Sequence, residues 1–302
     1  YLRRYKDMSE APVGMKQYIR MKSVDRAISE LKQILRNVPE VRKIAFIDDN
    51  FLSDEKYVEK FSKAYKAEIR LPFVINANPA SFNLRKAEFL KQAGCDCVRF
   101  GVESGSERIR RDILKRPLSN RALKAALDAS RSSGMAVSTY NMIGLPGETR
   151  DEIFETLRFN ALCRPEFVKV MTFYPFKNTP LYATCRDLGL INEEKKGGLV
   201  NYDTFSCLDF PPDHGLFLTK VQTVFHWYLN EFLNNEVSAV YRTRVRQVEV
   251  MDEDEWRKFD LDHVEKELLR QCERTGATHY AKKHGRSLAV KMAQMPERNG
   301  HA

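Results

Sequence analysis

Two short stretches decide the fold of this chain: Gly101-Val102-Glu103-Ser104-Gly105-Ser106 and Ile143-Gly144-Leu145-Pro146-Gly147-Glu148. Each follows an apolar segment typical of a strand and precedes a segment with helical periodicity. Where strands and helices alternate, the strands form a parallel sheet, and ligands bind at the carboxyl ends of those strands. Both stretches therefore mark strand ends at which we expect a binding site.

The same strand–helix order repeats through the first 180 or so residues. The pattern predicts strands at residues 41–47, 71–77, 97–102, 135–143 and 167–174. The expected N-caps are Ser23, Ser53 and Ser119, with capping boxes at Ser104/Glu107 and Thr149/Glu152. Gly94 and Gly134 are expected to end two of the helices. We therefore predict βα units around a parallel sheet.

The first expected element is a helix over residues 24–37, with no strand before it in the sequence. In a βα repeat each helix follows a strand, so the pattern implies a further strand upstream of Tyr1 and an open sheet edge beside residues 41–47. After about residue 200 the pattern changes to an amphipathic helix at 214–235 and segments rich in both charges. We therefore predict a barrel core at 1–200 and a helical extension at 201–302.

Composition limits the class of protein. Hydrophobic residues make up 43% and charged residues 30%, which is typical of a soluble globular chain. No apolar run approaches the roughly 20 residues that a membrane helix needs, and we find no signal peptide, so no membrane partner is expected. The scattered cysteines fit a reducing cytosol, so a cytoplasmic protein is expected. The formal charge of +9 permits an anionic substrate or a nucleic acid without requiring either.

The six cysteines are scattered, which argues against a disulfide framework. The only close pair, Cys95 and Cys97, has the spacing that puts two side chains on the same side of a strand. Two sulfurs are too few for a cluster, so we predict small buried thiols and no metal site there.

Glu103 lies where a strand ends and a helix begins. A carboxylate there can accept hydrogen bonds from an ammonium group or a ribose hydroxyl, or it can cap the following helix, and both alternatives stay open. Arg116 follows thirteen residues later. Its guanidinium suits a carboxylate ligand, whereas the alternative is a solvated arginine at a helix end, the state that we expect for Arg110 and Arg111.

Polar residues also mark two other strand ends. Asn141 could reach a ribose, or could be a strand residue that points at the helix layer. The glycines flanking Glu103 permit close approach of the backbone, and Gly144 begins a tight turn. Asp48 and Asp49 follow the first expected strand, but no further acidic residues cluster with them, so we predict no metal site.

In order and spacing, these motifs resemble the radical S-adenosylmethionine (radical SAM) enzymes over about residues 20–185, especially the branch that often carries a cobalamin-binding domain. The stretch at 101–106 resembles the fourth-strand motif of the family, and the loop at 144–149 resembles the loop after its fifth strand. Residues 48–51 resemble the end of its second strand. The resemblance implies that S-adenosylmethionine binds at Asp49, Asn50, Glu103, Arg116, Asn141 and Gly144.

The resemblance implies an α/β fold: a partial parallel (β/α)6-type, TIM-like barrel with its first strand missing, followed by a mainly α-helical C-terminal extension. It implies a radical SAM enzyme in which a four-iron–four-sulfur cluster reductively cleaves S-adenosylmethionine to a 5′-deoxyadenosyl radical. Methyl or methylthio transfer, or C–C or C–H modification, of an unknown substrate would follow. A reductant such as flavodoxin or ferredoxin is implied, and cobalamin held by an upstream domain is an open alternative.

One departure from the family pattern is plain. The chain contains no CxxxCxxC motif, the source of the cluster ligands in that family. We expect these cysteines upstream of Tyr1 and expect the fragment alone to be inactive. The alternative is a non-catalytic module that binds a ligand or partner on the same barrel. RNA modification stays open because the N-terminus is basic, although a solvated basic surface is the simpler explanation.

Overall fold

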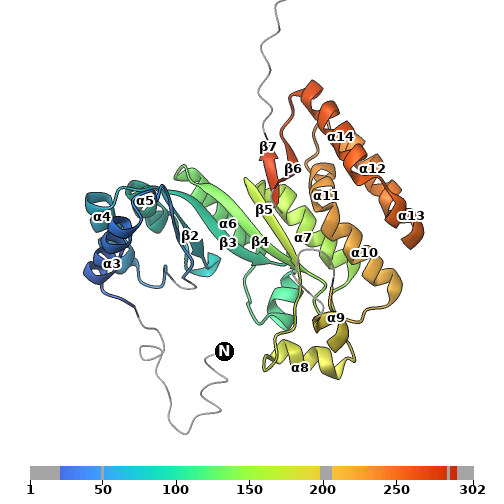
Figure 1. The fold of residues 1–302 in the computed structure, drawn as a ribbon, viewed down its shortest axis with the longest axis horizontal. Helices are drawn as coiled ribbons and strands as arrows, with labels where there is room; N and C mark the ends of the chain where they lie inside the picture. Colours follow the sequence, from blue (N-terminus) through green and yellow to red (C-terminus); the bar gives the residue numbers. More distant parts are fainter. Residues whose placement is uncertain (1–20, 49–50, 198–205, 284–285, 291–302) are drawn as a thin grey trace, which may run out of the picture.

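The computed structural model describes residues 21–48, 51–197, 206–283 and 286–290 (Figure 1). Their strands form one sheet in the order β1-β2-β3-β4-β5-β7-β6. The five parallel strands are β1 (Ile44–Phe46), β2 (Phe73–Ala77), β3 (Cys95–Glu103), β4 (Ala136–Ile143) and β5 (Phe167–Thr172). The expected parallel partial barrel is therefore confirmed, with each predicted strand present and most of them shorter at one end.

Helical segments connect successive parallel strands. They are α4 (Glu55–Glu68), η1 (Pro79–Ser81), α5 (Leu84–Ala93), the π-helical η2 (Ile109–Ile113), α6 (Asn120–Ser132) and α7 (Arg150–Cys163), with α3 (Val24–Asn37) before β1. Ser23 and Ser119 cap α3 and α6, and the capping box of Thr149 and Glu152 forms at α7. Gly94 ends α5 in the left-handed conformation, as expected.

Two predicted helix starts are wrong. Asp54, not Ser53, caps α4, because its carboxylate accepts hydrogen bonds from the backbone of both Lys56 and Tyr57. The capping box expected for Ser104 and Glu107 does not form. The Glu107 side chain accepts a hydrogen bond from the backbone N–H of Asn120 instead, at the start of the next helix.

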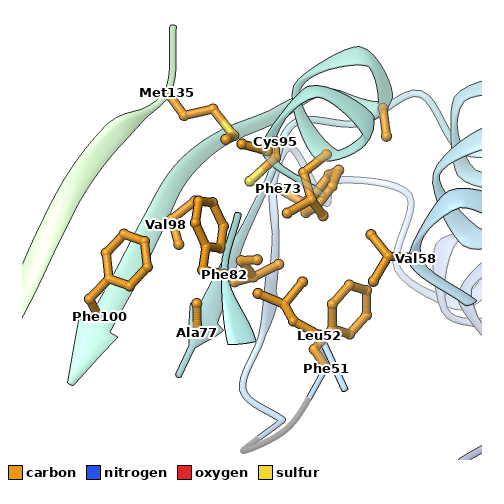
Figure 2. Packing of buried hydrophobic residues seen from close by; sticks show 14 of the residues in the cluster. Phe51, Leu52, Val58, Phe73, Ala77, Phe82, Cys95, Val98, Phe100 and Met135 are labelled. Carbon is orange, nitrogen blue, oxygen red and sulfur yellow. The ribbon is translucent and has the colours of Figure 1, made fainter. Parts of the chain in front are cut away.

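The main core lies between one face of the sheet and the helices α3 to α6. Apolar residues of β2 and β3 pack there against buried side chains of α4 and α5, and Figure 2 shows Phe73, Val98 and Phe100 pointing into this cluster. Aromatic rings interlock within it: the ring centroids of Tyr65 and Phe73 are 4.7 Å apart. This packing leaves the opposite face of the sheet for other contacts, and we call that face the interior face.

The C-terminal part is mainly helical, with helices α8 (Pro180–Asp187), α9 (Glu193–Gly197), α10 (Pro212–Thr223), α11 (Phe225–Phe232), α12 (Ser238–Val250), α13 (Glu253–Lys258) and α14 (Leu261–Thr275). The single helix expected at 214–235 is wrong, because the chain leaves helical geometry at Val224 between α10 and α11. Buried side chains of α10, α11, α12 and α14 form a second core with α7 and β5. No helix in the described ranges is long and apolar enough to cross a membrane.

The C-terminal hairpin was not predicted from the sequence. Strands β6 (His279–Lys283) and β7 (Arg286–Val290) pair with each other, and β7 adds antiparallel to β5. The hairpin covers the β5 edge of the sheet. At the other edge, β1 pairs only with β2 among the described residues, and Ile47 after it is 74% exposed. The open edge expected there stays a prediction.

Candidate functional site

The interior face carries a different set of residues from the face that packs on the helices. Side chains alternate between the two faces of a strand. In β3 the residues that pack against the helices are Val98, Phe100 and Val102. Arg99 and Gly101 therefore lie on the interior face. The pairing with β4 shifts register between Gly101 and Glu103, but the Glu103 side chain folds back to the same face, because a Cβ on Gly101 would lie 2.5 Å from Glu103 Oε1. All three residues are only partly buried. Glu103 is the last residue of β3, so it stands at the carboxyl end of the sheet.

Glu103 and Arg116 form an ion pair at this strand end. Arg116 Nη1 donates a hydrogen bond to Glu103 Oε1 at 2.8 Å, and their side chains are 65% and 19% exposed respectively. Burial raises the pKa of Glu103 above its usual value, even though the charge of Arg116 lowers it. The structure thus brings two of the predicted site residues together, on elements that are thirteen residues apart.

The backbone beneath this pair is adapted to it. Glu103 has φ = +66°, a left-handed conformation that costs a non-glycine residue of order 1 kcal/mol or more and that is found mostly at functional sites. A Cβ at Gly101 would lie 2.5 Å from Glu103 Oε1 and 3.7 Å from Arg116 Nη1. The glycine therefore makes room for the ion pair to fold back over β3.

Arg110 fixes the loop that carries Arg116. The prediction that Arg110 is a solvated helix-end residue is wrong: it is 2% exposed and donates hydrogen bonds to the carbonyl oxygens of Ser104 and Leu118. The backbone N–H of Arg116 donates to Arg110 O at 2.7 Å. Arg111 is exposed, as expected, and pairs with Asp112. The buried arginine ties the loop to the end of β3, which holds Arg116 near Glu103.

The structure places Asn141 on the other face of β4. Its side chain is completely buried and faces α7, where Asn160 Nδ2 donates to Asn141 Oδ1 at 2.8 Å and Asn141 Nδ2 donates to Lys169 O at 3.1 Å. This is the second of the two alternatives that the sequence left open. A contact with a ribose would require this hydrogen-bond network to open.

Gly144 begins the tight loop after β4, with φ = +73°. A Cβ on Gly144 would lie 3.2 Å from Leu218 Cδ1, so α10 covers it closely. The sequence reasoning did not assign a role to Glu148 in this loop. Glu148 Oε2 accepts hydrogen bonds from the backbone of Gly144 and Leu145 at 2.7 and 3.2 Å, while Oε1 is buried without a partner among the described residues.

The carboxyl groups of Glu148, in this loop, and of Glu152, in α7, differ sharply in pKa. Glu148 is 7% exposed, and burial raises its pKa to about 8, which favours the protonated form at neutral pH. Glu152 accepts two hydrogen bonds of 2.7 Å from the guanidinium of Arg108, and this pairing holds the pKa of Glu152 at about 2. Glu152 also accepts a hydrogen bond from Ser106, so it joins α7 to the loop after β3.

The remaining residues predicted from the sequence add little to the candidate site. Asp49 and Asn50 lie outside the described residues. Cys95 and Cys97 are buried, as predicted, and burial raises their pKa values to about 12 and about 11. They do not share one face, because a register shift in the pairing with β2 intervenes and only Cys95 joins the helix-side core (Figure 2).

Arg99, Tyr140 and Lys169 of β3, β4 and β5 were not singled out from the sequence. Arg99 lies two residues before Gly101, and Gly101, Tyr140 and Lys169 pair in register across the three strands. All three charged or polar side chains are partly buried on the interior face. The alternation of Arg99 with the apolar residues Val98 and Phe100 could have predicted that Arg99 faces away from the core.

Comparisons with known proteins agree on the family. The model of the Radical SAM superfamily matches residues 5–159, about half of the chain. An uncharacterized methyltransferase of Pyrococcus horikoshii is 30% identical over 177 residues, which cover 58% of this chain and 38% of that protein. Cytidylyl-2-hydroxyethylphosphonate methyltransferase of Streptomyces wedmorensis is 23% identical over 200 residues, which cover 61% of this chain and 37% of that protein.

Among the solved structures with a similar fold are two radical SAM enzymes. Coproporphyrinogen III oxidase from Escherichia coli, a radical SAM enzyme, superposes with a TM-score of 0.50 at 16% identity and covers 73% of this chain and 51% of its own. The cobalamin-dependent S-adenosylmethionine radical enzyme OxsB superposes with a TM-score of 0.51 at 15% identity and covers 76% and 41%. The chain matches less than two fifths of the length of the two methyltransferases named above.

Proposed function

This chain belongs to the radical SAM superfamily, and from that premise we propose that its partial barrel binds S-adenosylmethionine at the Glu103–Arg116 pair, as the core of a larger methyltransferase. The observation that carries the proposal is the ion pair itself. It stands at the carboxyl end of β3, on the interior face, over a glycine that leaves room for it. Ligands of parallel sheets bind at this end of the strands.

The chemistry of the pair fits the methionyl end of the cofactor, which carries one ammonium and one carboxylate group. Arg116 can exchange Glu103 for the cofactor's carboxylate, and Glu103 can exchange Arg116 for the ammonium group or a ribose hydroxyl. Where the ammonium group replaces Arg116, each charged side chain keeps an opposite charge, and where a ribose hydroxyl does, Glu103 keeps a hydrogen-bond donor. The left-handed backbone of Glu103 fixes the direction from which its carboxylate acts.

The residues of this chain do not fit the second group that the family uses, the iron–sulfur cluster. No set of three His, Cys, Asp or Glu side chains that could hold a metal occurs in the described ranges, and the sequence lacks CxxxCxxC. When bound, cluster and cofactor together supply the reductive cleavage of S-adenosylmethionine. We derive no step at the cluster or at a cobalamin from these residues.

Methyl transfer is the outcome best supported by the relatives. Two curated relatives are named methyltransferases, and OxsB is named a cobalamin-dependent radical enzyme. Because the chain matches only part of the methyltransferases, the cobalamin, the reductant and the substrate belong to the proposal for the longer protein. What this chain contributes in the proposal is the cofactor site and the interior face beside it.

Calorimetric titration of the chain with S-adenosylmethionine tests the proposal. Charge-assisted hydrogen bonds contribute about 1.5–3 kcal/mol, so Arg116→Ala is expected to weaken the affinity by about tenfold or more. Arg111→Ala is the matched control, since Arg111 is an exposed arginine five residues away that pairs with Asp112. Equal affinity of wild type and Arg116→Ala, or equal losses in both variants, would remove Arg116 from the site.

A further inference from the structure

We propose that the interior face beside the Glu103–Arg116 pair holds an oxyanion group of the substrate, with Arg99 as its main ligand and Tyr140 and Lys169 next to it. The chemical class is a phosphoryl, phosphonyl or carboxylate anion. The assignment of this anion to a substrate rests on the proposed function. The anion site itself rests on the arrangement of the side chains and does not require S-adenosylmethionine.

The register of the sheet places these side chains together. Gly101 of β3 pairs with Tyr140 of β4, and Tyr140 pairs with Lys169 of β5. Paired residues on neighbouring parallel strands point to the same face about 4.8 Å apart, and Arg99 lies one repeat, about 6.6 Å, before Gly101. The three side chains therefore surround one region of the interior face, next to the space over Gly101 that the Glu103–Arg116 pair occupies.

Arg99 has no hydrogen-bond or ion-pair partner among the described residues. Its side chain is nevertheless partly buried. Burying a charge without a partner is costly, and proteins normally avoid it. A planar guanidinium in this position is suited to bind an oxyanion with two parallel hydrogen bonds.

Other buried cations of this protein are satisfied by the protein itself. Lys86 donates hydrogen bonds to the carbonyl oxygens of Leu52 and Ser81 at 2.8 and 2.7 Å. The guanidinium of Arg110 donates to the carbonyl oxygens of Ser104 and Leu118. Arg99 differs from both in lacking such a bond. The difference indicates that its partner is a ligand rather than a structural group.

A second unsatisfied group lies beside Arg99. Ser138 of β4 pairs in register with Arg99, is 2% exposed, and its hydroxyl has no hydrogen-bond partner among the described residues. Thr139, the next residue, faces the helices and bonds to Asn160, so Ser138 faces the interior. A guanidinium, a hydroxyl, a phenol and an ammonium group then converge on one face, and all four can donate hydrogen bonds to an anion.

The location suits a substrate. The Glu103–Arg116 pair folds back over Gly101, directly beside Tyr140 in the register of the sheet. An anion held by Arg99 would anchor one end of the substrate and leave the rest of the molecule against the proposed cofactor site. Positioning of this kind brings a reacting carbon close to the group that attacks it.

The test is a titration of the full 302-residue chain with methylphosphonate and, separately, with acetate, without S-adenosylmethionine. We expect saturable binding of at least one anion. Arg99→Met should weaken it by about tenfold or more, and Tyr140→Phe should weaken it to a smaller extent. The matched control is Arg121→Met, which removes an exposed arginine of α6 and should leave binding unchanged. The tighter of the two probes identifies the group as phosphonyl or carboxylate.

Three results of the titration would overturn the proposal: no saturable binding of either anion, wild-type binding by Arg99→Met, or an equal loss in the Arg121→Met control. A thermal unfolding scan supplies the second readout. Arg99→Met should unfold at the wild-type temperature or above it, because it removes an unpaired charge; a clear decrease would mark Arg99 as structural and contradict the proposal. Titration of Arg99→Met with S-adenosylmethionine should give wild-type affinity, so the anion site and the cofactor site can fail separately.

Discussion

Gly105 is predicted to be required by packing and not by a ligand. Its backbone N–H donates a hydrogen bond to Thr156 Oγ1 at 2.8 Å, where the chain after β3 crosses α7. A Cβ at this position would lie 2.4 Å from the carbonyl oxygen of Glu155 and 2.5 Å from Thr156 Cα. Both atoms belong to the backbone of a helix and cannot rotate away. Gly105→Ala must therefore push α7 away from the loop that follows Glu103.

The size of the effect follows from two contributions. Overpacking costs typically about 1–3 kcal/mol, and the hydrogen bond to Thr156 is worth about 1 kcal/mol. We therefore expect Gly105→Ala to lower the free energy of unfolding by about 2–4 kcal/mol, measured by urea denaturation followed by circular dichroism. The loss should appear as a lower midpoint with an unchanged slope.

Gly215→Ala is the matched control. Gly215 lies inside α10, and a Cβ there would meet no atom within 4 Å. Because alanine is the better helix former, this substitution should stabilise the protein by about 0.5–1 kcal/mol. If Gly105→Ala were as stable as wild type, the close crossing of the loop and α7 would be refuted, and with it the position assigned to the end of β3.

Three further predictions concern buried titratable groups. Because burial raises the pKa of Glu148 to about 8, the wild-type free energy of unfolding should fall as the pH rises from about 5 to 8. Glu148→Gln should abolish this fall when the free energy is measured by denaturation at several pH values. The same pH dependence in the variant and the wild type would contradict the prediction. Glu152 has its pKa lowered to about 2, so the opposite sign holds: Glu152→Gln should cost about 2 kcal/mol at pH 7, and the difference from wild type should shrink as the pH falls from about 4.5 towards 2. Cys95 and Cys97 have raised pKa values, so mass spectrometry should find them unmodified by iodoacetamide at pH 7.5 until urea unfolds the chain; rapid modification of the native protein would refute this.

Features that depend on neighbouring residues could be predicted from the sequence. Ser23, Ser119 and Thr149 cap helices because the partner of each cap lies within three residues. The prediction that Ser53 caps a helix is wrong because Asp54, one residue later, offers a stronger hydrogen-bond acceptor. The strands of the parallel sheet were found for a similar reason, since each carries its own run of apolar residues.

Features that depend on distant partners could not be predicted. Glu107 bonds to Asn120 rather than to Ser104, and the β6–β7 hairpin joins β5 across more than a hundred residues. The burial of Arg110 could be recognised only from the structure, because it depends on the loop after η2, whose Leu118 carbonyl oxygen accepts a hydrogen bond from Arg110. In each case the deciding contact comes from another part of the chain.

Part of the candidate site could be predicted from the sequence. Glu103 and Arg116 could be paired through a family resemblance, but the resemblance did not show that they bond to each other. The orientation of Asn141 could have been found from the pattern alone, because Val137 and Ile143 share its parity on β4 and are buried. The same parity argument, applied to β3, places Arg99 on the face that Glu103 occupies.

The central claim is that the Glu103–Arg116 pair receives S-adenosylmethionine. A crystal structure of the chain with S-adenosylmethionine tests it most directly. We expect that Arg116 leaves Glu103, to which it now donates at 2.8 Å, and binds the carboxylate of the cofactor, while Glu103 accepts a hydrogen bond from its ammonium group or a ribose hydroxyl. Cofactor bound elsewhere, with the ion pair intact, would contradict the proposed site.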